Sequence, residues 1–260
     1  MKPQRRVNWL EYTLEAWALG LFMFSACGFG VLLFHPASPL VTTIPDPLTR
    51  RLLMGIAMGL TAMGNFYSPW GRRSGAQMNP AVTLTFFRLG RMAGHDALGY
   101  VTAQFAGGVL GTFVAAALFH RWIADPAVAY AVTLPGRWGA GWAFAGELAI
   151  SFGLMLTVLT ISGWEGRAGF TGLAAGVLVA TYITLEAPVS GMSMNPARTL
   201  GSAIPAMRWE ALWIYFTAPP VGMLLAVEVR SLLGLGHEKH CAKMHHDSRY
   251  RCIFCEHRAR

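Results

Sequence analysis

Two nearly identical segments, 116 residues apart, hold the residues with the clearest chemical pattern. They span 74–84 and 190–200, and eight of their eleven positions are identical. Each contains an Asn-Pro-Ala triplet, namely Asn79, Pro80 and Ala81 in the first and Asn195, Pro196 and Ala197 in the second. Asparagine is a preferred helix N-cap, and proline at the first helical position loses no hydrogen bond. Each segment therefore predicts the start of a helix, and the runs that follow, 81–87 and 197–204, predict half-helices too short to cross a bilayer.

One of the two segments also carries a charge. Arg198 stands where the first segment has Val82. An arginine inside a membrane span costs about 2.5 to 3.5 kcal/mol on insertion scales. A water-lined constriction is the simplest explanation for such a residue.

A second chemical pattern lies near the carboxyl end. Cys241 precedes the pair His245 and His246, and Cys252 and Cys255 form a C-x-x-C pair. Two thiolates at this spacing grip one ion, and a further Cys and His complete a tetrahedron, so we expect a zinc site with His245 or His246 as its fourth ligand. A basic tail lying on anionic lipid and a palmitoylated cysteine are the alternatives. A disulfide is disfavoured if the tail faces a reducing cytoplasm.

The composition shows which elements must position these residues. Of 260 residues, 54% are apolar and only 13% are charged, whereas soluble domains carry roughly 25% charged residues. This excludes a disordered chain, most cytosolic enzymes and a nucleic-acid module built on the net charge of +8. The sequence also lacks a Gly-rich phosphate loop and a nucleophile with a base at a suitable spacing, so we expect that the protein is not an enzyme. The expected solvent is a lipid bilayer.

Six apolar runs are long enough to span that bilayer. They cover 16–34, 52–70, 97–119, 138–163, 168–185 and 211–227, the fourth interrupted only by Glu147. None alternates with the period of two that a barrel strand needs, so we predict an all-α membrane protein with six transmembrane helices. Basic residues near the amino terminus, in 72–91 and in the tail favour one side, which places both termini in the cytoplasm.

Three spans per half make the two halves an inverted repeat, because an odd number of crossings reverses the orientation. We predict a cytoplasmic terminus over 1–10 and a channel domain over 11–230. The repeats of this domain cover about 11–120 and 138–230, and 231–260 form a Cys/His-rich cytoplasmic tail. The two half-helices then meet at the midplane from opposite sides, where their positive dipole ends repel cations.

Paired Ser-Gly-x-x-x-Asn-Pro-Ala segments on an inverted six-span repeat resemble the major intrinsic protein family, the aquaporins and aquaglyceroporins. The resemblance covers about residues 10–230. It implies that Asn79 and Asn195 donate hydrogen bonds to one passing oxygen, so that water passes and protons do not. It also implies a homotetramer in the bilayer, each subunit holding its own pore, with no cofactor for transport.

The resemblance gives roles to buried carboxylates. Glu15 and Glu147 match the family's glutamates that accept hydrogen bonds from backbone amides of the half-helix loops. For Glu186, two interpretations stay open: it braces the loop 190–195, or it faces water. A proton relay would make the protein an ion-coupled transporter, but the spans lack a staggered series of ionisable groups.

The family also places an arginine in a selectivity filter near the outer mouth, and Arg198 matches it. Ile183 and Met192 then lie opposite it, and Ile183 stands where water channels usually have histidine. The second span supplies the fourth wall, which is Met58 in the alignment we favour. Gly55 or Gly59 are alternatives, because the stretch 65–73 carries an insertion.

The choice of solute depends on four positions. Thr199 replaces the aspartate of glycerol channels, Ala203 replaces their basic residue, and Tyr215 with Phe216 replaces their proline and aliphatic residue. These differences favour single-file water conduction. Glycerol, ammonia, peroxide and metalloid acids remain alternative solutes.

Overall fold

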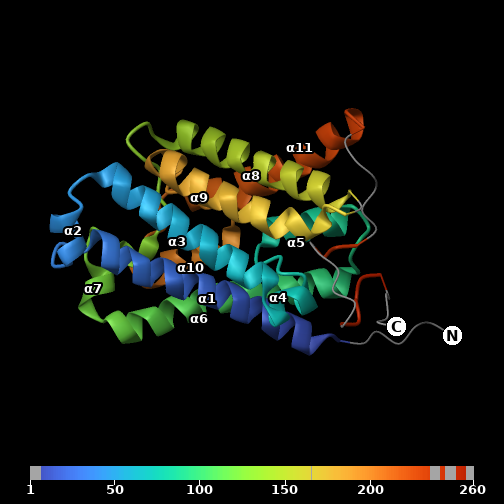
Figure 1. The fold of residues 1–260 in the computed structure, drawn as a ribbon, viewed down its shortest axis with the longest axis horizontal. Helices are drawn as coiled ribbons and strands as arrows, with labels where there is room; N and C mark the ends of the chain where they lie inside the picture. Colours follow the sequence, from blue (N-terminus) through green and yellow to red (C-terminus); the bar gives the residue numbers. More distant parts are fainter. Residues whose placement is uncertain (1–6, 165, 235–240, 244–249, 256–260) are drawn as a thin grey trace.

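The computed structural model describes residues 7–164, 166–234, 241–243 and 250–255. Within these ranges the chain is helical and contains no strand. Six long helices lie side by side along the long axis of the molecule (Figure 1). They are α1 (Trp9–Phe34), α3 (Pro47–Tyr67), α6 (Gly94–Phe119), α8 (Ala140–Ser162), α9 (Thr171–Ser190) and α11 (Leu212–Leu232). The all-helical architecture predicted from the sequence is thereby confirmed.

Five of the long helices are long and apolar enough to cross a membrane. The sixth, α3, has 21 residues but begins with Arg50 and Arg51 in its first turns, which shorten its uncharged stretch. It ends at Tyr67, three residues before the predicted limit of the span. Ser68 adopts an extended conformation there, and its hydroxyl accepts a hydrogen bond from Gly71 N, which starts α4 (Pro69–Ser74). The stretch 65–73, for which the sequence suggested an insertion, therefore contains a separate short helix.

Short helices complete the fold. Two of them, α5 (Pro80–Arg88) and α10 (Pro196–Ala206), are the half-helices predicted by the repeated triplets. They enter the bundle from opposite ends (Figure 1). The half-helix of each repeat packs on the last long helix of the other, α5 on α11 and α10 on α6. The remaining short elements are α2 (Pro39–Thr43), α7 (Arg121–Ala124), η1 (Ala129–Ala131) and η2 (Ala168–Phe170).

The two ends of the bundle differ. One end carries α2 and α7 and is called the loop end; the other carries the start of α1 and the described tail segments and is called the tail end (Figure 1). From the centre, α10 runs toward the loop end and α5 toward the tail end. The two half-helices thus point from the centre toward opposite ends of the bundle.

Glycines bring the long helices close together. A Cβ atom at Gly107 of α6 would overlap the backbone of α1. On α3, Gly55 faces Ala180 of α9, and Gly59 faces both Gly176 and Ala180. Close backbone approach at small residues is the usual way in which membrane helices pack. Because higher numbers on α3 meet lower numbers on α9, the two helices run antiparallel, and this register is used below.

Candidate functional site

The tips of the two half-helices are joined by reciprocal hydrogen bonds. Asn79 Nδ2 donates to the carbonyl of Met194 at 2.7 Å, and Asn195 Nδ2 donates to the carbonyl of Met78 at 2.7 Å. Each asparagine also caps its own helix, because its Oδ1 accepts from the backbone of Ala81 or Ala197. A carboxamide NH₂ group has two N–H bonds, so each asparagine keeps a second donor.

The loops before the asparagines share an unusual backbone. Ala76 and Met78 in one loop and Met192 and Met194 in the other have φ between 50° and 55°. The left-handed region costs a residue with a Cβ atom roughly 1 to 2 kcal/mol. The same alternation at matching positions of both repeats therefore needs support from the surrounding structure.

For the first loop, that support is the buried carboxylate of Glu15 on α1. Its Oε1 accepts from Ser74 Oγ at 2.7 Å and from Gln77 N at 3.1 Å. Its Oε2 accepts from Met78 N at 2.6 Å and from Gln104 Nε2 at 2.9 Å. All four partners are donors, and a carboxylate can accept from all of them.

The second loop has the equivalent arrangement around Glu147 on α8. This carboxylate accepts from Ser190 Oγ at 2.7 Å, Ser193 N at 2.6 Å and Met194 N at 2.7 Å. Ser190 Oγ also lies 2.8 Å from Glu186 Oε2, so Glu186 contacts the start of the loop, as in one of its two interpretations. The two glutamates thus hold the backbone whose carbonyls receive the asparagine side chains.

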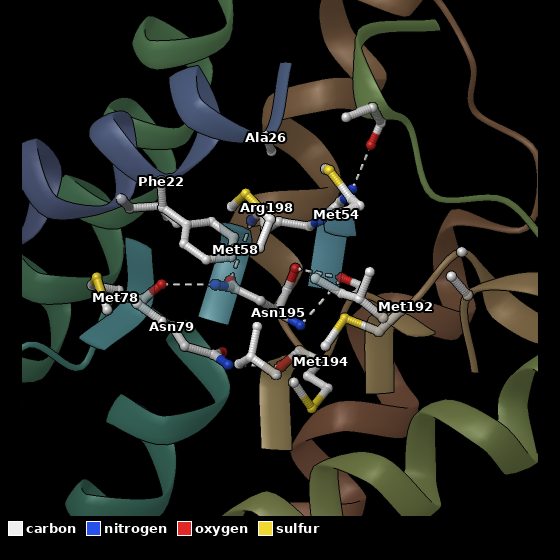
Figure 2. A pocket seen from close by; sticks show the side chains of 18 of the residues that line it. Phe22, Ala26, Met54, Met58, Met78, Asn79, Met192, Met194, Asn195 and Arg198 are labelled. Atoms are coloured by element: carbon white, nitrogen blue, oxygen red, sulfur yellow. Dashed lines mark hydrogen bonds between the residues drawn. The ribbon is translucent and has the colours of Figure 1, made fainter. Parts of the chain in front are cut away.

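A cavity of about 430 Å³ passes these tips. Asn79, Asn195 and Arg198 are among its few polar side chains, and methionine, valine and phenylalanine form much of the rest (Figure 2). Arg198 Nη1 donates to the carbonyl of Ala131 at 2.7 Å, which holds the guanidinium in the cavity wall. Ala131 belongs to η1, where Ala129, Tyr130 and Ala131 all have positive φ. No feature of the sequence indicated this loop as a partner of Arg198.

The other predicted filter residues also line this cavity. Ile183, Met192 and Met58 all contribute to its wall. Gly55 and Gly59 face the backbone of α9 instead, so neither alternative for the fourth wall points into the cavity.

Several wall residues were not predicted from the sequence, and two of them lie near Arg198 or the half-helix tips. Met54, one turn before Met58 on α3, and Phe22 on α1 both point into the cavity (Figure 2). The methionine spacing on α3 was a usable signal for Met54. Phe22 lies in an apolar run that offers no pattern for choosing it.

Three of the four positions used to choose between solutes lie behind the wall, whereas Phe216 is exposed and stacks on Phe105. Thr199 Oγ1 is hydrogen-bonded to Ser193 Oγ and lies 2.9 Å from Thr133 Oγ1. Tyr215 is buried, and its hydroxyl donates to the carbonyl of Ser190. Ala203 is also buried. These residues shape the second half-helix and its loop without lining the cavity.

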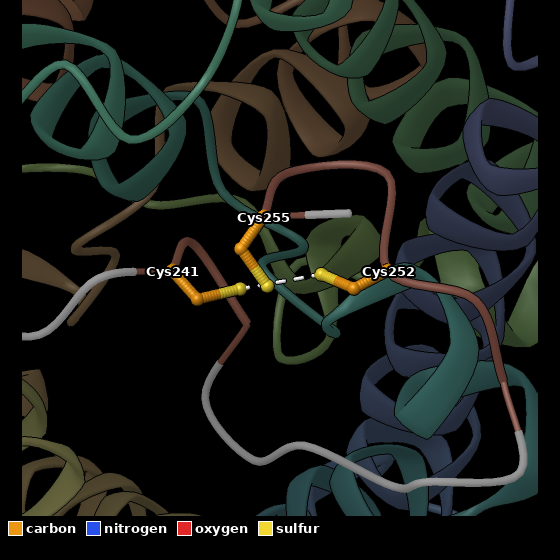
Figure 3. A group of neighbouring side chains, drawn as sticks. All are labelled: Cys241, Cys252 and Cys255. Atoms are coloured by element: carbon orange, nitrogen blue, oxygen red, sulfur yellow. Dashed lines mark hydrogen bonds between the residues drawn. The ribbon is translucent and has the colours of Figure 1, made fainter. Parts of the chain in front are cut away.

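The tail brings three predicted metal ligands together. The sulfur atoms of Cys241, Cys252 and Cys255 all lie within 4.8 Å of one another (Figure 3). His245 and His246, the two candidates for the fourth ligand, lie outside the described residues. The hydrogen bond with Cys252 and burial raise the pKa of the Cys241 thiol. A metal ion binding here would therefore displace protons from thiols.

Six long helices, five of them apolar enough to cross a membrane, surround a cavity that two capped half-helices enter from opposite ends. This arrangement defines a transmembrane channel. The family follows from sequence comparison. A model of the major intrinsic protein family matches residues 4–229, and the chain belongs to this family. Its members are channels and not enzymes, in agreement with the expectation from the sequence.

Named relatives fall into two groups. The chain is 36% identical to "Aquaporin NIP6-1" of Arabidopsis thaliana over 174 residues, which are 66% of this chain and 55% of that protein. It is 35% identical to "Glycerol uptake facilitator protein-like 6" of Lactiplantibacillus plantarum over 191 residues, 70% of this chain and 85% of that protein. The match thus spans little more than half of the first relative.

A solved structure has the same fold. The aquaglyceroporin from Plasmodium falciparum superposes with a TM-score of 0.70, covering 85% of this chain and 94% of that one. Sequence identity is 20%, so this similarity concerns the fold.

Proposed function

We propose that the cavity conducts water in single file and excludes protons and ions. The observation that carries the proposal is the reciprocal pair of carboxamides at the half-helix tips. One N–H of each asparagine is held by a carbonyl of the opposite loop, and the other is available to a passing oxygen. A water molecule that accepts from both turns its own hydrogens away from them, which interrupts the chain of donors that a proton needs.

Glycerol or another small neutral solute is the second candidate. It is favoured by the apolar wall around Met54, Met58 and Ile183, which can contact the carbon backbone of a polyol. One relative is also named as a glycerol uptake facilitator. The sequence differences at Thr199 and Ala203 argue for water as the main solute.

Purified protein in liposomes distinguishes these candidates. A sucrose shock should cause fast shrinkage of the liposomes, which is measured by light scattering. A pH-sensitive dye inside the liposomes should report no proton current. Swelling in isosmotic glycerol as fast as the shrinkage in sucrose would favour the second candidate. Dependence on an ion gradient would indicate a coupled transporter and contradict both.

We further propose that Met54, rather than Met58, completes the filter with Arg198, Ile183 and Met192. Gly55 faces Ala180 and Thr184 of the antiparallel helix α9. Its neighbour Met54 therefore lies at the same height along the bundle axis as Ile183.

Met58 lies at a different height along the bundle axis from Met54. Gly59 faces Gly176 and Ala180, which places its neighbour Met58 at the level of Val179, closer to the tail end. Arg198 lies three residues, about 4.5 Å of helix, beyond Asn195 toward the loop end. Met54 lies about 6 Å beyond Met58 in the same direction.

Alanine variants of the two methionines test this assignment. Met54→Ala should increase the ratio of glycerol to water permeability, because it widens the level at which Arg198 lies. Met58→Ala is the matched control and should change the ratio less. An equal or larger effect of Met58→Ala would restore the earlier assignment.

The assembly and orientation are further proposals. Helix faces with exposed apolar side chains, such as Leu110, Val114 and Leu118 of α6, suit lipid or neighbouring subunits in a homotetramer. We place both termini in the cytoplasm, with 1–10 as the amino-terminal segment, 11–230 as the channel domain and 231–260 as the tail. Cross-linking in membranes should give four-subunit products, and protease added to sealed inside-out vesicles should cleave the tail.

We also propose that zinc binds to the thiolates of Cys241, Cys252 and Cys255. A zinc ion with Zn–S bonds of about 2.3 Å requires sulfur atoms about 3.8 Å apart in a tetrahedron. The observed cluster, with all three sulfur atoms within 4.8 Å and one pair at 3.3 Å, needs only small adjustments to reach this spacing.

A further inference from the structure

The first described tail segment, Cys241–Lys243, rests on the loop of the first half-helix. Gln77 Nε2 donates to the carbonyl of Ala242 at 3.1 Å, and Lys243 Nζ donates to the carbonyl of Arg72 at 3.2 Å. A Cβ atom built on Gly75 would lie 3.2 Å from Lys243 Cγ, so the lysine stem covers the loop directly. Ala242 is fully buried, although it lies in a tail at the end of the chain.

This contact is also a contact with the wall of the proposed pore. Gln77 lines the central cavity, and its Oε1 accepts from Thr83 of α5. Ala242 belongs to the same buried apolar cluster as Val82 and Val158, both of which line the cavity. The tail segment therefore lies at the tail end of the bundle and contacts Gln77 of the cavity wall.

The second tail segment, 250–255, is seated nearby on the helices. Ile253 and Phe254 pack against the main apolar cluster. The ring of Phe254 lies 5.7 Å from that of Tyr100 on α6, whose hydroxyl donates to the carbonyl of Ser74. This segment thus also contacts the support of the first half-helix loop.

The three thiols are the junction between the two segments. Cys241 comes from the first, and Cys252 and Cys255 come from the second (Figure 3). In the docked arrangement the three sulfur atoms converge. A ligand that binds all three sulfur atoms in this arrangement, and less well in a released one, stabilises the docked tail.

We propose that a thiophilic divalent cation, zinc or its analogue cadmium, binds these three thiolates and closes the tail end of the pore by locking Ala242 over Gln77. This inference rests on the proposed conduction and on the proposed zinc site. Binding exchanges thiol protons for metal–sulfur bonds, with the protons released to water and no change in oxidation state. If the metal binds only the docked tail, free zinc at about 100 times its Kd raises the ratio of docked to released tail about 100-fold.

The test uses full-length protein in liposomes with a phosphine reductant throughout, so that no disulfide contributes. Shrinkage rates are measured with zinc on both sides and again after a chelator. The wild type should shrink at least several-fold more slowly with zinc. The Cys255→Ser variant should shrink at the chelated wild-type rate in both conditions, which also shows that it is folded.

Metal analysis and two further variants make the test specific. Wild type and the control Cys27→Ser, a buried thiol of α1 outside the cluster, should each retain about one zinc per chain, and Cys255→Ser should lose it. Lys243→Ala removes an anchor of the tail while keeping all three thiols, so it should bind zinc and yet be slowed less than the wild type.

The outcomes separate the claims. Zinc bound with full stoichiometry but without effect on the wild-type rate would refute the closure and leave the channel and the metal site intact. Equal zinc in Cys255→Ser and wild type would refute the site. No shrinkage in either condition would instead refute conduction, and the closure with it.

Discussion

Replacing Glu15 with glutamine should misfold the first half-helix loop. The carboxylate accepts from Gln77 N on one oxygen and from Met78 N on the other. A glutamine has a single carbonyl oxygen, so its NH₂ group must face either Met78 N with Gln104 Nε2, or Ser74 Oγ with Gln77 N. Because the Ser74 hydroxyl and the Gln104 amide can each turn to accept from that NH₂ group, one buried backbone N–H is left unpaired, which costs about 1 to 3 kcal/mol.

This loss has a structural and a functional readout. For a chain of this size, about 2 kcal/mol corresponds to a decrease in Tm of roughly 4 to 8 °C. Because the carbonyl of Met78 receives Asn195, a displaced loop also moves the asparagine, and the liposome shrinkage rate should fall several-fold.

The matched control is Glu11→Gln, one turn earlier on α1. Glu11 forms an ion pair with Arg73 at 3.2 Å, and the arginine side chain is 39% exposed. Such a pair contributes about 0 to 1 kcal/mol. If Glu15→Gln melted within 2 °C of the control, the claim that this carboxylate supports the loop would be refuted.

Three further changes have distinct expected outcomes. Arg198→Ala removes a unit charge from the cavity wall, which at about 5 Å and an effective dielectric constant of about 20 lowers the barrier for a cation by about 3 kcal/mol. The proton leak measured with an internal dye should therefore rise up to roughly 100-fold. An unchanged leak would contradict this role of Arg198. Gly107→Ala should destabilise the fold by about 1 to 3 kcal/mol through overlap with α1, whereas Gly64→Ala, with no atom within 4 Å of the added Cβ, should keep its Tm. Asp46 caps α3 through hydrogen bonds from Thr49, which lower the pKa of the Asp46 carboxyl. This stabilisation is present above the unfolded pKa of about 3.9 and is lost as the pH falls through the folded pKa. Asp46→Ala should therefore lose less stability in acid than the wild type does, measured by thermal unfolding across pH.

Local sequence patterns determined much of the architecture. The apolar runs exceed the thickness of a bilayer, so their helical state follows from the need to pair backbone groups within each span. The Asn-Pro steps predicted where α5 and α10 begin, because an N-cap and a proline at the first position act on neighbouring residues only. The inverted relation of the halves follows from counting the spans.

The wall of the cavity required the tertiary structure. Which face of α3 meets the cavity depends on its rotation, and that rotation is set by Gly55 and Gly59 against α9. The stretch 65–73 next to the span, which contains α4, left the alignment of this span ambiguous in the sequence. Met54 and Met58 lie one turn apart and both line the cavity, so spacing in the sequence does not choose between them.

Contacts between distant parts of the chain were also beyond the sequence. Arg198 is held by a carbonyl of η1, and any residue type offers a backbone carbonyl, so composition gives no signal for this partner. The Cys pattern in the tail predicted a ligand set, but not that Ala242 would be buried against Gln77. The sequence alone therefore determined the helices and the capped tips, which depend on near neighbours and on the solvent. Only the tertiary structure decided which residues line the pore and where the tail contacts the bundle, because both depend on how the helices rotate and pack.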